Sequence, residues 1–283
     1  MDKLTLETEA KLLEAIGYID KVVAVGKSAL EKFPTGDYDL LVFTFINYLE
    51  RFTHNLEAVN ILLREYKDKP NIETSIGLTI RASLLDFMTI TYLSTYQADI
   101  LSKDDKENEA KFNKQFDGLM TDQIHNTIKY LKLTRDVGLI TKYEYNVAIE
   151  NSWHTYGFLF TDKTVNYENP ESKLISKEHK SPKQYFTRIH NHPLTKKFSM
   201  VYDLYTYYCK YEHFGRMTHF MQRQGLNKDF EMMVASMKYM IRGIGASFSY
   251  LSHPGDKLKI EKKQWMSFKI ILINSKVDRS NYR

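Results

Sequence analysis

Two apolar seams near the N-terminus constrain the fold of this chain most. In both, apolar residues recur at alternating intervals of three and four, the spacing of one buried helix face. The first seam is Leu12, Ile16, Ile19, Val23, Gly26, Leu30 and Phe33. The second is Val42, Phe45, Leu49, Phe52, Leu56, Val59, Leu63 and Tyr66. A short segment, Pro34, Thr35 and Gly36, separates them. The chain is therefore predicted to begin with an antiparallel helical hairpin.

Helical signals continue as far as about residue 251. Residues 72–100 are apolar on two sides, which is typical of a central helix. Capping residues indicate several helix starts: Thr5 or Thr8, Asp37, Thr141 with Glu144, Ser181 with Gln184, and Asn227. Gly243 and Gly245 interrupt the last helical stretch, and we expect them to allow close helix approach or to mark a kink.

The composition supports an all-α fold, because 12 Gly and 6 Pro provide too few turns for a many-stranded β protein. We predict one all-α domain over residues 1–283, a helical bundle of about seven to nine helices. The domain is expected to contain an irregular insertion at about 152–180 and a basic C-terminal segment at 257–283.

Charge and cysteine content limit the classes of function. The single cysteine excludes an internal disulfide, and the chain lacks a basic, apolar leader and any uninterrupted membrane-length apolar run. We therefore expect a cytoplasmic protein that does not enter a membrane. The formal net charge is +5, but residues 171–197 hold seven basic against two acidic residues, and 257–283 hold eight against two. Two basic segments on an acidic body predict contact with phosphate or with an acidic partner, unless both are solvated faces.

A tyrosine-rich stretch, residues 200–222, carries the first group of candidate site residues. His213, Arg216 and His219 follow one another at intervals of three, on adjacent turns of a helix. Such residues suit phosphodiester chemistry, with histidine as acid or base and arginine stabilising the developing charge. The alternative is that the histidines are core or surface residues and that Arg216 pairs with a neighbouring acid.

A second group is a predicted polar cluster in the core. Arg81 lies among apolar residues of the central helix, so its guanidinium needs an internal acceptor. The predicted members of this cluster are Arg81, Asp86, Asp203, Cys209 and Glu212. We expect Asp203 or Glu212 near Arg81, and His213 beside them.

A third group is basic. The predicted anion-binding residues are Lys183, Arg188, His190, His192, Lys196 and Lys197, unless they form a solvated basic loop. Glu50, His54 and Glu57 share a helix face, but a solvated polar face explains them more simply than a metal site. No Gly-rich nucleotide loop, zinc-protease or redox motif is present. We predict neither a metal nor a cofactor.

Residues 80–93, IRASLLDFMTITYL, together with residues 205–220, YTYYCKYEHFGRMTHF, resemble HEPN-like bacterial helical proteins of uncharacterised families. The resemblance covers about half of the chain and implies an all-α fold, dimerisation and a link to defence or toxin–antitoxin systems. Residue by residue it points to Arg81, Asp86, Cys209 and His213. The catalytic members of that family separate arginine and histidine by more residues than lie between Arg216 and His219, so the resemblance does not carry their ribonuclease activity over.

Two classes of function follow from these observations. The first is a non-catalytic interaction or regulatory module that binds an acidic protein. The alternative is a HEPN-like RNA-binding protein or metal-independent ribonuclease, working as a homodimer. The sequence leaves open whether the chain is an enzyme, and the absence of a strong catalytic motif favours the first class.

Overall fold

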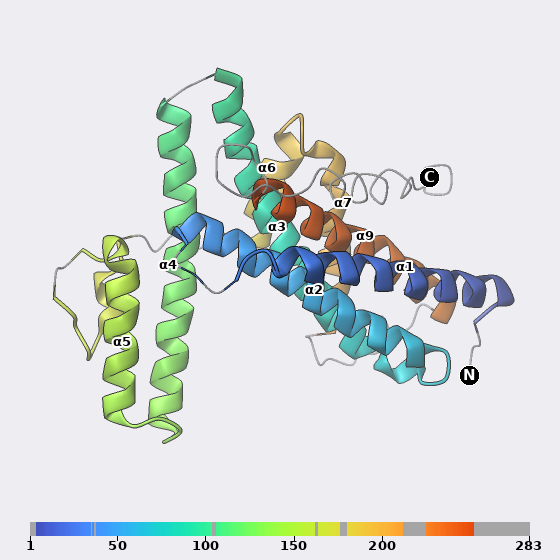
Figure 1. Ribbon diagram of the computed structural model, residues 1–283, viewed down its shortest axis with the longest axis horizontal. Helices are drawn as coiled ribbons and strands as arrows, with labels where there is room; N and C mark the ends of the chain where they lie inside the picture. The colour runs from blue at the N-terminus through green and yellow to red at the C-terminus, as the bar shows by residue number, and fades with distance from the viewer. Residues whose placement is uncertain are drawn as a thin grey trace. The chain divides into compact units, whose positions relative to one another are not determined.

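The computed structural model describes residues 4–34, 36, 38–103, 106–161, 164–175, 180–211 and 225–251. Within these residues the chain is a packed bundle of eight α-helices without strands, which confirms the all-α prediction (Figure 1). The helices are α1 (Leu6–Leu30), α2 (Leu40–Tyr66), α3 (Glu73–Lys103), α4 (Lys106–Asp136), α5 (Lys142–Tyr156), α6 (Pro182–Asn191), α7 (Met200–Cys209) and α9 (Leu226–Leu251). The short 3-10 helices are η1 (Pro70–Ile72), η2 (Gly157–Leu159), η3 (Pro170–Lys173) and η4 (Lys196–Phe198).

The chain divides into two compact units. The first comprises Met1–Thr91 and Phe186–Arg283, and the second comprises Tyr92–Tyr185. The two divisions fall inside α3 and α6, so each of these helices contributes residues to both units.

The core of the first unit forms where α1, α2 and α9 pack against one another (Figure 1). The predicted seam of α2 is buried completely from Leu49 through Tyr66. Gly243 of α9 lies directly against Phe52, since a Cβ built on it would come within 2.4 Å of Phe52 Cζ. Gly26 likewise allows α1 to approach α2 closely, since a Cβ built on it would lie 2.5 Å from Thr53 Oγ1. The predicted close helix approach at Gly243 is confirmed.

Most helix starts are capped as the sequence predicts. Thr5 caps α1, and Thr141 and Glu144 form a reciprocal capping box at α5. At α2 the cap is Asp39, whose carboxylate accepts from Leu41 N and Val42 N; Asp37, which the sequence suggested, lies outside the described residues. Asn227 does not precede α9 as predicted. It lies inside the helix, and its Oδ1 accepts from Thr5 N at 3.1 Å.

Among the described residues, one helical stretch, Pro70–Gln97 in η1 and α3, is long and apolar enough to cross a membrane by length and composition. Its most apolar window is 72% buried inside the protein. A core helix that is buried on nearly all sides has an equally apolar composition without crossing a membrane.

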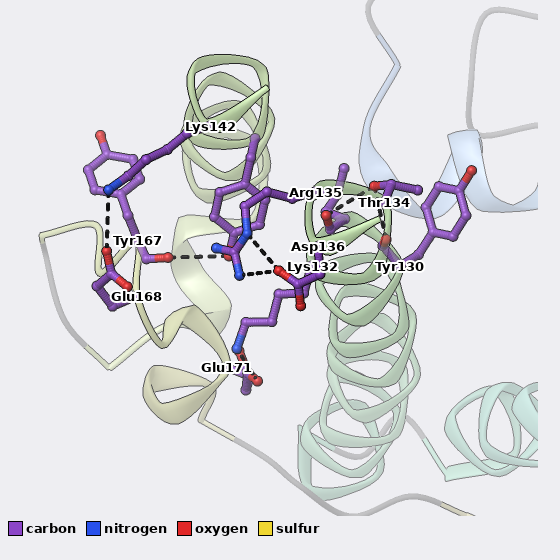
Figure 2. A network of polar contacts seen from close by, with 11 residues as sticks. Tyr130, Lys132, Thr134, Arg135, Asp136, Lys142, Tyr167, Glu168 and Glu171 are labelled. Carbon is purple, nitrogen blue, oxygen red and sulfur yellow. Dashed lines mark hydrogen bonds and ion pairs between the residues drawn. The ribbon is translucent and has the colours of Figure 1, made fainter. Parts of the chain in front are cut away.

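The second unit contains the α4–α5 hairpin, whose turn includes Gly138 in the left-handed region at φ +77°. Figure 2 shows the polar network where the two helices meet the irregular segment that follows them. The Arg135 guanidinium lies 4.5 Å from the Tyr145 ring centroid, and the Tyr145 hydroxyl donates to the Tyr167 carbonyl at 3.2 Å. Lys132 pairs with Glu171 at 2.6 Å. These contacts tie residues 164–175 to the hairpin.

Candidate functional site

A series of ring contacts runs along α6 and α7 in the first unit. The Phe186 ring stacks on Tyr202 with centroids 4.7 Å apart, and Tyr202 continues to Tyr205 at 6.5 Å; both pairs are inclined by 22°. On the other side, Phe186 contacts the imidazole of His190 at 5.4 Å. We call His190, Phe186, Tyr202 and Tyr205 the aromatic ladder. Its geometry is that of offset-stacked rings.

The aromatic ladder passes from the core to the surface. Tyr205 is buried, Phe186 and Tyr202 are half-buried, and His190 is exposed. The outer rings therefore present a partly open aromatic surface.

The inner end of the ladder is closed by Arg81. Its Cζ lies 5.0 Å from the Tyr205 ring centroid, its Nη2 donates to the Tyr205 hydroxyl at 3.1 Å, and its Nε donates to Cys209 Sγ at 3.4 Å. The structure thus brings together two residues of the predicted polar cluster, Arg81 and Cys209. Both are half-buried, so the guanidinium is held by a cation–π contact and polar groups at the margin of the core.

Of the other predicted members of the polar cluster, the structure describes Asp86 and Asp203. Asp86 is buried on a different face of α3 and pairs with Arg51 of α2 at 3.1 Å. Burial raises the pKa of the Asp86 carboxyl to about 6, and the charge of Arg51 opposes this. Asp203 is exposed on α7. Glu212 and the candidate catalytic residues His213, Arg216 and His219 lie outside the described residues.

The predicted anion-binding residues divide in a similar way. Lys196 and Lys197 are exposed on η4, next to the ladder. Ser199 connects η4 to the ladder, since its hydroxyl donates to the Lys196 carbonyl at 2.6 Å and contacts His190 Nδ1 at 3.2 Å. Arg188 is half-buried and His192 is buried, whereas Lys183 belongs to the second unit. Part of the predicted basic set therefore lies beside the exposed end of the ladder.

Sequence reasoning missed two further cations of α9, Arg242 and Lys238, of which Arg242 contacts the same ring as Lys197. The Arg242 Cζ of α9 is 5.7 Å from the Phe198 ring centroid, and Lys197 Nζ is 5.1 Å from the same centroid. Lys238 lies one turn before Arg242 on α9 and feels its charge. Like charges four residues apart on a helix repel each other. That spacing, in a stretch otherwise rich in apolar residues, was the sequence signal that could have found them.

Sequence reasoning also missed a buried ionic cluster around Lys210. Its ammonium lies 3.8 Å from Asp229 Oδ1 and 4.0 Å from Glu73 Oε1, while the Tyr207 hydroxyl donates to Asp229 and the Tyr211 hydroxyl to Glu73. Burial lowers the pKa of Lys210, and the two carboxylates oppose that effect. Because the two buried carboxylates share one ammonium and each accepts from a tyrosine hydroxyl, we assign the cluster to joining α3, α7 and α9.

The polar face of α2 does not gather its candidate ligands. Glu50 and His54 are exposed, and Glu57 pairs with Lys27 of α1 at 2.5 Å. In the second unit, a depression of about 530 Å³ is lined by residues of α5 and of segment 164–173. Its rim carries both signs of charge, with Lys142 and Glu168 3.9 Å apart (Figure 2), so it selects no class of ligand.

The fold and these sites define an all-α helical protein. No protein-family model matches the chain, and neither a curated protein nor a solved structure matches it.

Proposed function

We propose that this chain is a non-catalytic protein that binds single-stranded RNA on the surface formed by α6, η4 and α7. The observation that carries the proposal is the aromatic ladder, with its outer rings partly open and with Lys196 and Lys197 beside them. Unpaired bases stack on such rings, and the neighbouring ammonium groups attract the phosphates between the bases.

An acidic protein partner is the competing proposal. The exposed lysines would serve either partner, because carboxylates and phosphates are both anions. The ladder distinguishes them, since stacked rings that reach the surface offer π faces, for which a base is a better match than a carboxylate side chain. We therefore favour RNA as the partner. If the chain belongs to the HEPN-like family that its sequence resembles, RNA binding would fit that family.

The proposal is tested with purified protein and fluorescently labelled single-stranded RNA, by anisotropy. Loss of one stacking partner costs about 1–3 kcal/mol per base, which is about fivefold or more in the dissociation constant. His190→Ala and Tyr202→Leu should weaken binding to this extent. The matched control is His54→Ala, which removes an exposed histidine of the same unit that is not part of the ladder. Equal affinity in all four proteins would reject the ladder as the RNA surface.

Cleavage is tested in the same preparation. The RNA is incubated with and without divalent metal, beside His213→Ala and Arg216→Ala variants. The non-catalytic proposal expects intact RNA in every sample. Metal-independent cleavage that both substitutions abolish would instead support the ribonuclease alternative, because an arginine–histidine site depends on each residue separately.

A further inference from the structure

Two cations, Lys197 and Arg242, contact the Phe198 ring next to the ladder. The Phe198 ring has Lys197 Nζ 5.1 Å and Arg242 Cζ 5.7 Å from its centroid. Arg242 Cζ also lies 5.3 Å from the centroid of Tyr239. The guanidinium is thus oriented by two aromatic contacts, which fixes its direction more firmly than a free surface arginine would allow.

The charges in this group are only partly balanced. Among the described residues, no ion pair is found for Lys197, Lys238 or Arg242. Asp203 of α7 supplies a negative charge to this region. Burial raises the pKa of the Tyr239 phenol, the charge of Arg242 lowers it, and the charge of Asp203 raises it. Burial and the charge of Arg242 both lower the pKa of Lys238. Three cations against one acid leave an excess of positive charge.

The rings themselves are not open to a base. Tyr239 is buried, and Phe87 packs edge-on against both Phe198, at 5.6 Å, and Tyr239, at 5.2 Å. This region therefore offers charge and hydrogen-bond donors without a stacking surface. An arginine fork and two lysines suit a group with several anionic oxygens.

We propose that Lys197, Lys238 and Arg242 form a phosphate-binding site. The inference deepens the proposed function and rests on it, because the site would hold a backbone phosphate of the same RNA whose bases stack on the ladder. The same chemistry would accept a free inorganic polyphosphate, so the two sources have to be separated by experiment.

The test compares the intact chain with a Lys238→Gln/Arg242→Gln double variant. The probes are inorganic tripolyphosphate, a labelled single-stranded RNA of about ten nucleotides, and a ribose–phosphate oligomer of equal length without bases. The matched control is Lys69→Gln, which removes an exposed lysine near the far end of α9, where the Tyr66 hydroxyl meets the Leu226 carbonyl. Thermal melting shows whether each variant is folded.

The site predicts that the double variant loses affinity for all three probes by about tenfold, whereas Lys69→Gln does not. The slope of log K against log salt for RNA should fall by about 0.7 for each phosphate that the variant no longer neutralises. Equal tripolyphosphate affinity in the wild type and the folded double variant would overturn the site. If the double variant loses affinity for tripolyphosphate but the wild-type protein does not bind RNA, the phosphate site stands and the proposed function fails. If the ladder variants lose affinity for RNA while the double variant keeps its affinity for all three probes, the proposed function stands and the phosphate site fails.

Discussion

The buried Asp86 carboxyl makes stability depend on pH in a way that one substitution can isolate. Burial raises its pKa from 3.8 to about 6 although Arg51 lies 3.1 Å away. Between these two values the folded protein holds a proton that the unfolded chain releases, so the free energy of unfolding falls as pH rises. A difference of about two pKa units corresponds to about 3 kcal/mol of unfolding free energy. This contribution is present below pH 4 and is lost above pH 6.

Asp86→Asn removes this titration. Measured by urea denaturation from pH 4 to pH 8, the variant should gain about 3 kcal/mol relative to the wild type across that range. The pKa of about 6 already includes the charge of Arg51, so the change with pH of the difference between the two unfolding free energies carries the result. Arg51→Gln is the control, because removal of the opposing charge should raise the pKa of Asp86 further, so that this variant loses more stability as pH rises and goes on losing it to a higher pH than the wild type. Parallel curves for the wild type and Asp86→Asn would refute the argument.

Two further predictions concern packing and the buried ionic cluster. Gly243→Ala should destabilise the protein by about 1–3 kcal/mol in thermal or urea melts, because the added methyl would meet the buried Phe52 ring. Gly17→Ala, where nothing lies within 4 Å, should instead stabilise α1 by about 0.5–1 kcal/mol; the same sign at both positions would contradict this account. Lys210→Met should cost about 3 kcal/mol, because it leaves Glu73 and Asp229 buried without their cation, and an unchanged melting temperature would show that they do not need it.

Periodicity and capping chemistry predicted the fold class and most helix starts. The seam from Leu49 to Tyr66 and the Thr141–Glu144 capping box depend on residues close together in the chain, so sequence alone revealed them. Sequence suggested Asp37 as the cap of the second helix, whereas Asp39 caps α2, because the position of the first helical turn decides which acid can serve.

The candidate site was predicted only where its parts are local. Lys196, Lys197 and His190 lie in one basic segment and drew attention by charge. Arg81 and Cys209 were both placed in the predicted polar cluster, but the partner expected for the guanidinium was a carboxylate, and its contact with Tyr205 was not foreseen. The Lys210 cluster joins residues from three helices, and no spacing in the sequence reports such a meeting.

The central claim is that bases, and not charge alone, hold RNA on the aromatic ladder. Its most direct test compares the affinity of the wild-type protein for a single-stranded RNA and for a ribose–phosphate oligomer of equal length without bases. The account predicts that the RNA binds at least about tenfold more tightly, and that Tyr202→Leu removes most of this difference. Equal affinity for the two polymers would show that the surface recognises phosphate charge only, and would contradict the account.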